Sequence, residues 1–361
     1  MMPSQPVFKD ALVFTGGGTG GHFFPAVALA EGARKRWSGL PIAFVGAVRG
    51  IEAKRLPESC WPHLLLDVEG FLGRSPLAIS RALWKLWQAR RTLLALWTRE
   101  RPKAVVATGG YGSGPAVLAA KALGIPYFLH ESNAQPGVLV KRSSRGARRV
   151  WCGMEAVKER LPGADCLMVG TPIRADFLRE FLPADRLTPP YRLLVLGGSG
   201  GALALNEAMM QAAPELLARF PDWEILHQTG ARDFPALEHR ERHARHRIQA
   251  FLEEVHLEME AASLVISRSG ASTCAELKAC GRPALLVPMP GSAGDHQTMN
   301  ALAMVAEGRA VHLAQAGQLP SALVEAASKL MGDASARAGF APAVPNQAVV
   351  LCLADLEAVL H

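Results

Sequence analysis

Short apolar runs that lead into glycine-rich turns recur along the whole 361-residue chain, and this feature constrains its fold more than any other. Each turn is followed by a segment whose composition suits a helix. Short buried strands that alternate with helices are typical of parallel sheets. The pattern therefore predicts an α/β protein with strands at residues 11–14, 104–107, 193–196, 264–266 and 284–287.

The glycine-rich turn after a first strand occurs twice, at residues 16–22 and again at 197–201. Two such turns are typical of two successive doubly wound domains, and the chain is about twice as long as an average domain. Four prolines between residues 170 and 191 mark the boundary. We expect an N-terminal Rossmann-like domain over residues 1–175, a C-terminal one over 176–345, and a terminal helix over 346–361.

The net charge of +7 is unevenly distributed. Residues 1–150 contain 21 lysines and arginines against 8 acidic residues, whereas the remainder contains 18 against 24. A basic half is expected to face an anionic partner, and both nucleic acid and an anionic lipid surface carry that charge.

Cysteine usage and hydropathy bear on the cellular compartment. The six cysteines are scattered and form no C-x-x-C pair, which is typical of a reducing environment. The apolar stretch near the N-terminus is too short for a signal peptide, and no run approaches the ~20 apolar residues of a membrane-spanning helix. We therefore expect a cytoplasmic protein unless something else tethers it.

The first glycine-rich turn contains the pattern G-x-G-x-x-G at Gly16, Gly18 and Gly21. A dinucleotide-binding site has an acidic residue after the next strand. Here residues 42–45 lead into glycine and alanine instead, which argues against a dinucleotide cofactor. A P-loop is excluded, because no Gly-Lys-Ser/Thr follows any of these turns. One such turn is often only a tight connection, but five at the ends of parallel strands favour a site for a phosphorylated ligand.

Six motifs stand in one order along the chain: GGGTGGH at 16–22, GGY at 109–111, HESN at 130–133, GGS at 197–199, RSGA at 268–271 and DHQTMNA at 295–301. Together they resemble the MurG family of N-acetylglucosaminyltransferases. The resemblance implies a GT-B fold, in which two Rossmann-like domains face each other across a cleft that holds the active site.

The resemblance also implies a reaction. N-acetylglucosamine would pass with inversion from UDP-N-acetylglucosamine to the 4-hydroxyl of N-acetylmuramoyl-pentapeptide diphosphate undecaprenol (lipid I), giving lipid II and UDP in peptidoglycan synthesis. The donor would bind mainly the C-terminal domain, and the lipid acceptor would bind the basic N-terminal domain. No motif suits a metal ion, so we expect neither metal nor cofactor. The implied partners are an anionic membrane surface on the cytoplasmic face of the cell membrane and a cell-wall synthesis complex, with no nucleic acid.

Several donor-binding residues follow from the resemblance by position. Ser199 would contact the nucleotide phosphates, and Arg174 would help to hold UDP. The backbone of Leu252 would meet the uracil, and Gln297 would bind the hydroxyls of the donor sugar. A stretch that wraps the nucleoside would consist of Ala271, Ser272, Thr273, Cys274, Ala275 and Glu276.

Glu276 would accept hydrogen bonds from the ribose, although a solvated position on a helix is the alternative. Donor contacts from the first domain would come from Thr19, Gly20, Gly21 and Asn133, and Tyr111 would be a further substrate-binding residue. The chain departs from the family pattern at two places. His296 stands where the family often has a second glutamine, and Ser132 replaces a common glutamine.

An inverting transfer needs a base that takes the proton of the acceptor hydroxyl. His22 closes the first glycine-rich turn, and an imidazole with its ordinary pKa of ~6.5 suits that task at neutral pH. The alternatives for His22 are that it caps a helix or binds the acceptor diphosphate. Glu131 is the rival base, and a structural carboxylate is its alternative role.

Residues 74–103 combine Trp84, Trp87 and Trp97 with leucines and with eight lysines and arginines, against the single acid Glu100. Basic amphipathic helices that carry tryptophan bind at the headgroup layer of anionic membranes. The segment is therefore predicted to dock the enzyme on the membrane, and packing against the first sheet is the alternative.

Three other functions remain open from the sequence. Two are enzymes of the same architecture, a UDP-N-acetylglucosamine 2-epimerase and a lipid glycosyltransferase such as a diacylglycerol glucosyltransferase. The third is a catalytically inactive scaffold for wall synthesis. The basic apolar segment argues against the epimerase, and intact His22, Asn133, Glu276 and Gln297 argue against the scaffold.

Overall fold

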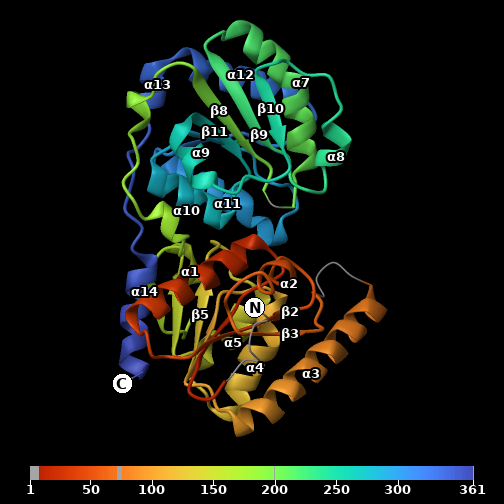
Figure 1. Ribbon diagram of the computed structural model, residues 1–361, viewed down its shortest axis with the longest axis vertical. Helices are drawn as coiled ribbons and strands as arrows, with labels where there is room; N and C mark the ends of the chain where they lie inside the picture. Colours follow the sequence, from red (N-terminus) through yellow and green to blue (C-terminus); the bar gives the residue numbers. More distant parts are fainter. Residues whose placement is uncertain (1–7, 71–74, 199, 361) are drawn as a thin grey trace. The chain divides into compact units, whose positions relative to one another are not determined.

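The computed structural model describes residues 8–70, 75–198 and 200–360. The chain forms two compact units, one that reaches Arg174 and resumes at Asn346, and another from Ala175 to Pro345. Each unit contains one parallel sheet flanked by helices (Figure 1). The terminal helix, which the sequence analysis set apart as residues 346–361, thus belongs to the first unit.

In the described part of the first unit, seven strands form a parallel sheet in the order β3-β2-β1-β4-β5-β6-β7. Every residue of β1 and β4 is buried, because helices cover both faces of the sheet. The order reverses between β1 and β4, and ligands of such sheets bind at this kind of switch point. The strands are β1 (Leu12–Thr15), β2 (Ile42–Ala47), β3 (His63–Leu66), β4 (Ala104–Ala107), β5 (Tyr127–Glu131), β6 (Arg149–Cys152) and β7 (Cys166–Met168).

Helices form two layers on this sheet. On one face α3 and α4 pack onto a core that includes Leu93 and Trp97, and on the other α1 and α14 meet, as Figure 1 shows. The terminal α14 is held by Asp355, which accepts a hydrogen bond of 2.9 Å from Trp151 Nε1 and pairs with Arg149 at 3.1 Å. The helices are α1 (Gly20–Arg36), α2 (Glu52–Arg55), α3 (Pro76–Arg99), α4 (Gly114–Leu123), α5 (Val138–Ser143), α6 (Ala156–Glu159) and α14 (Ala348–Leu360).

The second unit repeats the plan over its described residues, with six parallel strands in the order β10-β9-β8-β11-β12-β13. Its switch point lies between β8 and β11, and α7 and α12 pack together on one core. The strands are β8 (Tyr191–Leu196), β9 (Trp223–Gln228), β10 (His246–Gln249), β11 (Ala262–Ser267), β12 (Ala284–Leu286) and β13 (Ala310–His312). The helices are α7 (Leu203–Arg219), α8 (Phe234–Leu237), α9 (Val255–Ala261), α10 (Ala271–Cys280), α11 (His296–Ala306), α12 (Leu319–Gly332) and α13 (Ala334–Ala338).

Two buried histidines stack between neighbouring strands of the second unit. The ring centroids of His227 and His246 lie 5.6 Å apart with the planes 5° from parallel, and His227 Nε2 lies 3.0 Å from Asn206 Oδ1. Burial lowers the pKa of His227 to about 3 and that of His246 to about 4. Both rings are therefore neutral at pH 7, where they pack without the cost of a buried charge.

The free energy of unfolding of this unit is therefore expected to fall in acid. Because the folded pKa values lie below ~6.5, the unfolded chain binds more protons, so this stability is fully present above pH 6.5 and is lost toward pH 4. Each histidine removes about 1.4 kcal/mol per pH unit within that window. Denaturant titrations at pH 7, 6 and 5 would measure the slope, and a His227→Gln/His246→Gln variant should flatten it. An unchanged slope in that variant would contradict the assignment.

Candidate active site

Two glycine-rich loops meet at the switch point of the first sheet. The loop at residues 16–19 follows β1, and the loop at 108–110 follows β4. Thr108 N donates to Thr15 O at 2.9 Å, and Gly17 N donates to Gly109 O at 3.3 Å. A Cβ at Gly110, whose φ is +80°, would overlap the carbonyl oxygen of Gly17. The glycines therefore allow the two loops to lie in backbone contact.

The imidazole of His22 is fixed where these loops meet. His22 lies in the first turn of α1, and its Nδ1 is 2.9 Å from the carbonyl oxygen of Thr108. The Thr108 hydroxyl in turn donates to His22 O at 2.6 Å. A carbonyl can only accept, so Nδ1 carries the proton and the lone pair is on Nε2. This is the tautomer that a general base requires.

Glu131 ends β5 and has the geometry of a structural carboxylate. Its Oε1 accepts from Asn133 N at 3.0 Å and from Asn133 Nδ2 at 3.2 Å, and its Oε2 accepts from Gly137 N at 2.8 Å. The residue is buried. Taking up a proton would disrupt these bonds, so the geometry favours the structural alternative over the rival base. Glu131 then orients Asn133.

Other first-unit candidates lie around the same loops. Thr19 is the N-cap of α1, with Gly20 and Gly21 in its first turn. The Tyr111 hydroxyl donates to Arg49 O at 3.3 Å, and its ring lies so close to Gly18 that a Cβ there would be 2.6 Å from it. Thr19 and Gly21 are exposed, whereas Gly20 and Tyr111 are half-buried. Tyr111 and the first turn of α1 thus lie at one edge of the sheet.

Arg174 belongs to the first unit. Its guanidinium lies over the ring of Phe24 on α1, 5.5 Å from the ring centroid. This places a cation beside the helix that carries His22, while the contact with UDP that the resemblance implied stays a prediction.

The glycine-rich loop of the second unit follows β8. Ser199 belongs to this loop but lies outside the described residues. Asn206 Nδ2 donates to Thr229 O at 2.8 Å and to Asp233 Oδ2 at 3.0 Å. A Cβ at Gly201, whose φ is +79°, would lie 2.6 Å from Asp233 Oδ2. Asn206 and Asp233 therefore pack against the glycines of this loop and support it. Neither residue was expected from the sequence.

The predicted nucleoside stretch forms the first part of α10, which begins after the N-cap Gly270. Ser272, Thr273, Ala275 and Glu276 are half-buried, whereas Ala271 and Cys274 face the core. Burial raises the pKa of Cys274 to about 12. The helical period turns the side chains of Ala271 and Cys274 inward, so at these two positions the predicted contact with the nucleoside would come from the backbone. The side chain of Leu252 is also buried, so only its backbone remains a candidate for the uracil.

Gln297 lies at the start of α11 in a network that ties three loops together. Its Oε1 accepts from Met289 N at 2.9 Å, which leaves the amide nitrogen as the group that can donate to a sugar hydroxyl. Ser269 Oγ donates to Gln297 O at 2.8 Å, and Asn300 Nδ2 donates to Ser269 O at 3.0 Å. Arg268 donates to Val287 O at 2.9 Å. Arg268, Ser269 and Asn300 were visible in the sequence motifs but were not assigned to the site.

Two parallel sheets, each with a glycine-rich loop at its switch point, are the architecture of the GT-B fold class, and the family matches make the chain a glycosyltransferase of that class. Residues 12–152 match the glycosyltransferase family 28 N-terminal domain, and residues 192–347 match its C-terminal domain. The crystal structure of Acinetobacter baumannii MurG matches with a TM-score of 0.72 and 26% identity, covering 97% of this chain and 99% of that one. A Listeria monocytogenes protein described as a UDP-N-acetylglucosamine 2-epimerase has a TM-score of 0.68 at 14% identity, which shows the fold alone.

Relatives named UDP-N-acetylglucosamine–N-acetylmuramyl-(pentapeptide) pyrophosphoryl-undecaprenol N-acetylglucosamine transferase are similar over most of their length. The protein of Syntrophotalea carbinolica is 38% identical over 325 residues, 89% of each chain. That of Alkalilimnicola ehrlichii is 40% identical over 316 residues, 83% of this chain and 84% of its own. The chain belongs to the MurG family, and the resemblance found in the sequence is confirmed.

Proposed function

We propose that the protein transfers N-acetylglucosamine from UDP-N-acetylglucosamine to the 4-hydroxyl of lipid I, forming lipid II with inversion and releasing UDP. The observation that carries the proposal is the fixed His22 imidazole at the switch point of the first sheet, in a chain whose relatives bear the name of this reaction. The first unit would hold the acceptor. The second unit would bind most of the donor, with further donor contacts from the first unit, among them Arg174.

In the proposed reaction His22 Nε2 takes the proton of the 4-hydroxyl while that oxygen attacks the anomeric carbon. The bond from this carbon to the UDP oxygen breaks, and its electron pair leaves with UDP. Backbone N–H groups of the loop after β8 and the N-terminus of α10 would stabilise the departing diphosphate. Arg174 and Glu276 keep their proposed contacts with UDP and its ribose.

Measuring UDP release with and without a lipid I analogue, in buffer containing EDTA, tests this function. We expect release that depends on the acceptor and a disaccharide product detectable by mass spectrometry. A 2-epimerase would act on UDP-N-acetylglucosamine without acceptor, and an inactive scaffold would release no UDP. A strict Mg²⁺ requirement would contradict the expected metal-free reaction.

The membrane contact is proposed to lie on α3. No helix in the described part of the chain is long and apolar enough to cross a membrane. On α3, Trp84 is 56% exposed and Trp87 48% exposed, whereas Trp97 is fully buried and lies 6.0 Å from Phe8. Trp97 therefore belongs to the core, as in the alternative in which this segment packs against the first sheet. The other two remain available to a headgroup layer.

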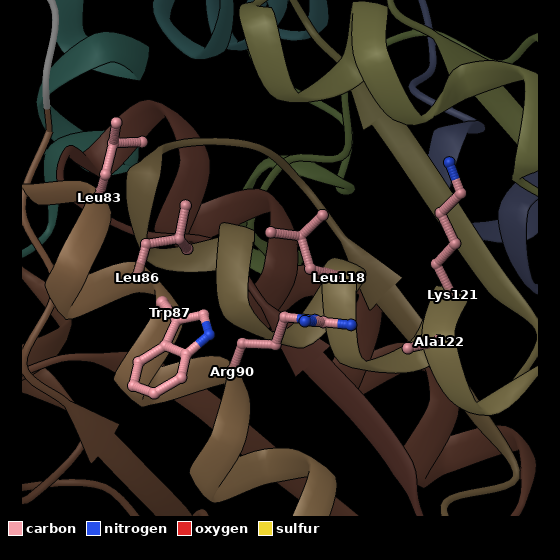
Figure 2. Close-up of a pocket in the computed structure, with 7 residues that line it drawn as sticks. All are labelled: Leu83, Leu86, Trp87, Arg90, Leu118, Lys121 and Ala122. Carbon is pink, nitrogen blue, oxygen red and sulfur yellow. The ribbon is translucent and has the colours of Figure 1, made fainter.

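The cations of α3 also divide into two groups. Arg81 and Lys85 form ion pairs with the buried carboxylate of Glu69, at N–O distances of 3.1 and 2.6 Å, so we assign both a structural role. Arg90 instead lines an apolar groove between α3 and α4, together with Lys121. Figure 2 shows Arg90 extending from α3 toward the α4 residues. The apolar residues of this groove are Leu83, Leu86, Trp87, Leu118 and Ala122.

Replacing Arg90 and Lys121 with glutamate should lower binding to anionic vesicles by at least about tenfold, since each cation near anionic lipid contributes ~1 kcal/mol. Activity on acceptor embedded in vesicles should fall with it, while a short-chain soluble acceptor should still be used. Sedimentation with vesicles measures the binding. The matched control is Lys35→Glu/Arg186→Glu, which makes the same charge change at exposed positions, one on α1 and one in the second unit. Equal binding by both variants would place the membrane contact elsewhere.

A further inference from the structure

A buried carboxylate lies beneath the first glycine-rich loop, and the reaction described above does not use it. Glu52 opens the short helix α2, and its side chain is fully buried. Both of its carboxylate oxygens lie 2.9 Å from Gly18 N, and Oε1 also lies 3.4 Å from Ala47 N. The carboxylate of Glu52 thus accepts from a backbone N–H group of the loop that the sequence predicts to bind an anion.

Glycines from three segments leave the space that this carboxylate fills. A Cβ at Gly17 would overlap Oε1 of Glu52, and one at Gly50, whose φ is +98°, would lie 2.7 Å from Oε2. A Cβ at Gly112 would lie 3.2 Å from Oε1. These glycines follow β1, β2 and β4, so the loops after three strands converge on one side chain. A side chain at Gly17 or Gly50 would displace the carboxylate of Glu52, so the buried position of this carboxylate depends on glycine there.

The contacts of Glu52 lead by short steps to His22. Glu52 holds Gly18 through its N–H group, and the adjacent Gly17 donates to Gly109 O at 3.3 Å. Gly109 follows Thr108, whose carbonyl accepts from His22 Nδ1. A Cβ at Gly109 would lie 2.8 Å from that same Nδ1, so the imidazole lies directly against this loop. A shift at Gly17 and Gly18 would therefore reach the ring.

We propose that Glu52 is a positioning residue, which sets the first glycine-rich loop and through it the tautomer and orientation of His22. Burying a carboxylate costs free energy, and burial raises the pKa of Glu52. Because Glu52 has no catalytic task, the role that we assign to it is to order the loop. The inference rests on the proposed function, because it takes His22 as the base and the loop as part of the acceptor site. Glu52 itself touches no reacting atom.

Substitution of Glu52 with alanine or glutamine tests this role. Alanine leaves the N–H groups of Gly18 and Ala47 without their acceptor, and glutamine places an N–H donor opposite Gly18 N. We expect Glu52→Ala to lower kcat/KM for the acceptor at least about tenfold, since small misplacements of catalytic groups are costly. Glu52→Gln should lie between alanine and wild type. UDP affinity should stay within about twofold, because the donor is proposed to bind mainly the second unit.

The matched control is Glu58→Gln, a change of the same charge at an exposed residue just after α2, where Glu58 lies 3.9 Å from Arg55. It should leave every parameter unchanged. A readout independent of activity is the ¹⁵N NMR signal of the His22 ring, which should show the Nδ1–H tautomer in wild type and a mixture in Glu52→Ala. This signal tests Glu52 even if the chain transferred a different sugar or none, so the two proposals fail separately.

Melting temperatures decide which variant is informative. If Glu52→Ala does not fold, Glu52→Gln decides alone. A folded variant with a raised acceptor KM or lowered kcat, unchanged UDP affinity and an altered tautomer supports the role. Wild-type kinetics and tautomer in a folded variant would overturn it. Parallel losses of UDP affinity, acceptor affinity and folded fraction would also overturn it, because they would show a general structural role.

Discussion

Replacing His22 with alanine should lower kcat by about 10²–10⁴-fold, the usual contribution of a general base. UDP affinity should remain within about twofold of wild type, because the donor is proposed to bind mainly the other unit. The reason lies in the geometry of the ring, whose Nδ1 donates to Thr108 O and whose lone pair is therefore on Nε2. Alanine removes that acceptor without adding bulk at the start of α1.

A matched control exists in the same unit. His63 on β3 also places its Nδ1 2.9 Å from a backbone carbonyl, that of Trp61, but away from the glycine-rich loops. His63→Ala should keep wild-type kcat, which would separate loss of the base from loss of any histidine held in this way. Steady-state kinetics from pH 6 to 9 and calorimetry with UDP provide the two measurements.

The opposite result would move the base elsewhere. If His22→Ala kept more than a third of wild-type activity across that pH range, His22 would bind or cap rather than accept the proton. Glu131 would then need to be reconsidered, although both of its oxygens already accept backbone N–H groups. A lost kcat together with lost UDP affinity would instead indicate a misfolded variant.

Most of the fold could be predicted because a strand buried on both faces must be continuously apolar. The runs that became β1, β4, β8, β11 and β12 all have that property. β10 does not, since its sequence HRIQ sits at an edge of the sheet and only His246 is fully buried. An edge strand is covered less and carries a weaker apolar pattern, so β10 is not among the strands expected from the sequence.

The candidate site could be predicted only where chemistry and spacing are local. The first glycine-rich turn and His22 lie within a few residues of one another, so the sequence alone placed them together. Glu52 reaches Gly18 across 34 residues of chain, and Thr108 reaches His22 across 86. No periodicity marks either contact.

The same limit applies to α3. The positions of Trp84, Trp87 and Trp97 along the helix do not show which of them is buried. Trp97 is buried against Phe8, a residue far away in the sequence. Likewise, Asp67 and Glu69 lie outside the segment 74–103, so counting charges within it could not show that Lys85 is already paired. Local patterns predicted an amphipathic helix, but tertiary contacts decide which of its side chains remain exposed.

Replacing Glu276 with alanine should weaken UDP binding by about 1.5–3 kcal/mol, the range for a hydrogen bond to a charged group, or roughly 10–150-fold in Kd. Glu276 lies on α10, where Ala271, Cys274 and Leu277 face the core and Glu276 itself is half-buried. That position suits a carboxylate that accepts from the ribose hydroxyls while the helix N-terminus faces the phosphates. The donor KM should rise accordingly, and purine nucleotides should still be excluded.

Glu307→Ala is the matched control for this prediction, because it removes an acid from the same unit. Glu307 follows α11 and pairs with Lys278 at 2.6 Å and Arg309 at 3.2 Å, with its side chain 43% exposed. Ion pairs this exposed contribute little to stability, so both variants should fold. Calorimetry with UDP should then show a weaker Kd for Glu276→Ala alone. Equal UDP affinity in the two folded variants would leave Glu276 as a solvated helix residue, and the ribose contact would have to come from another side chain of α10.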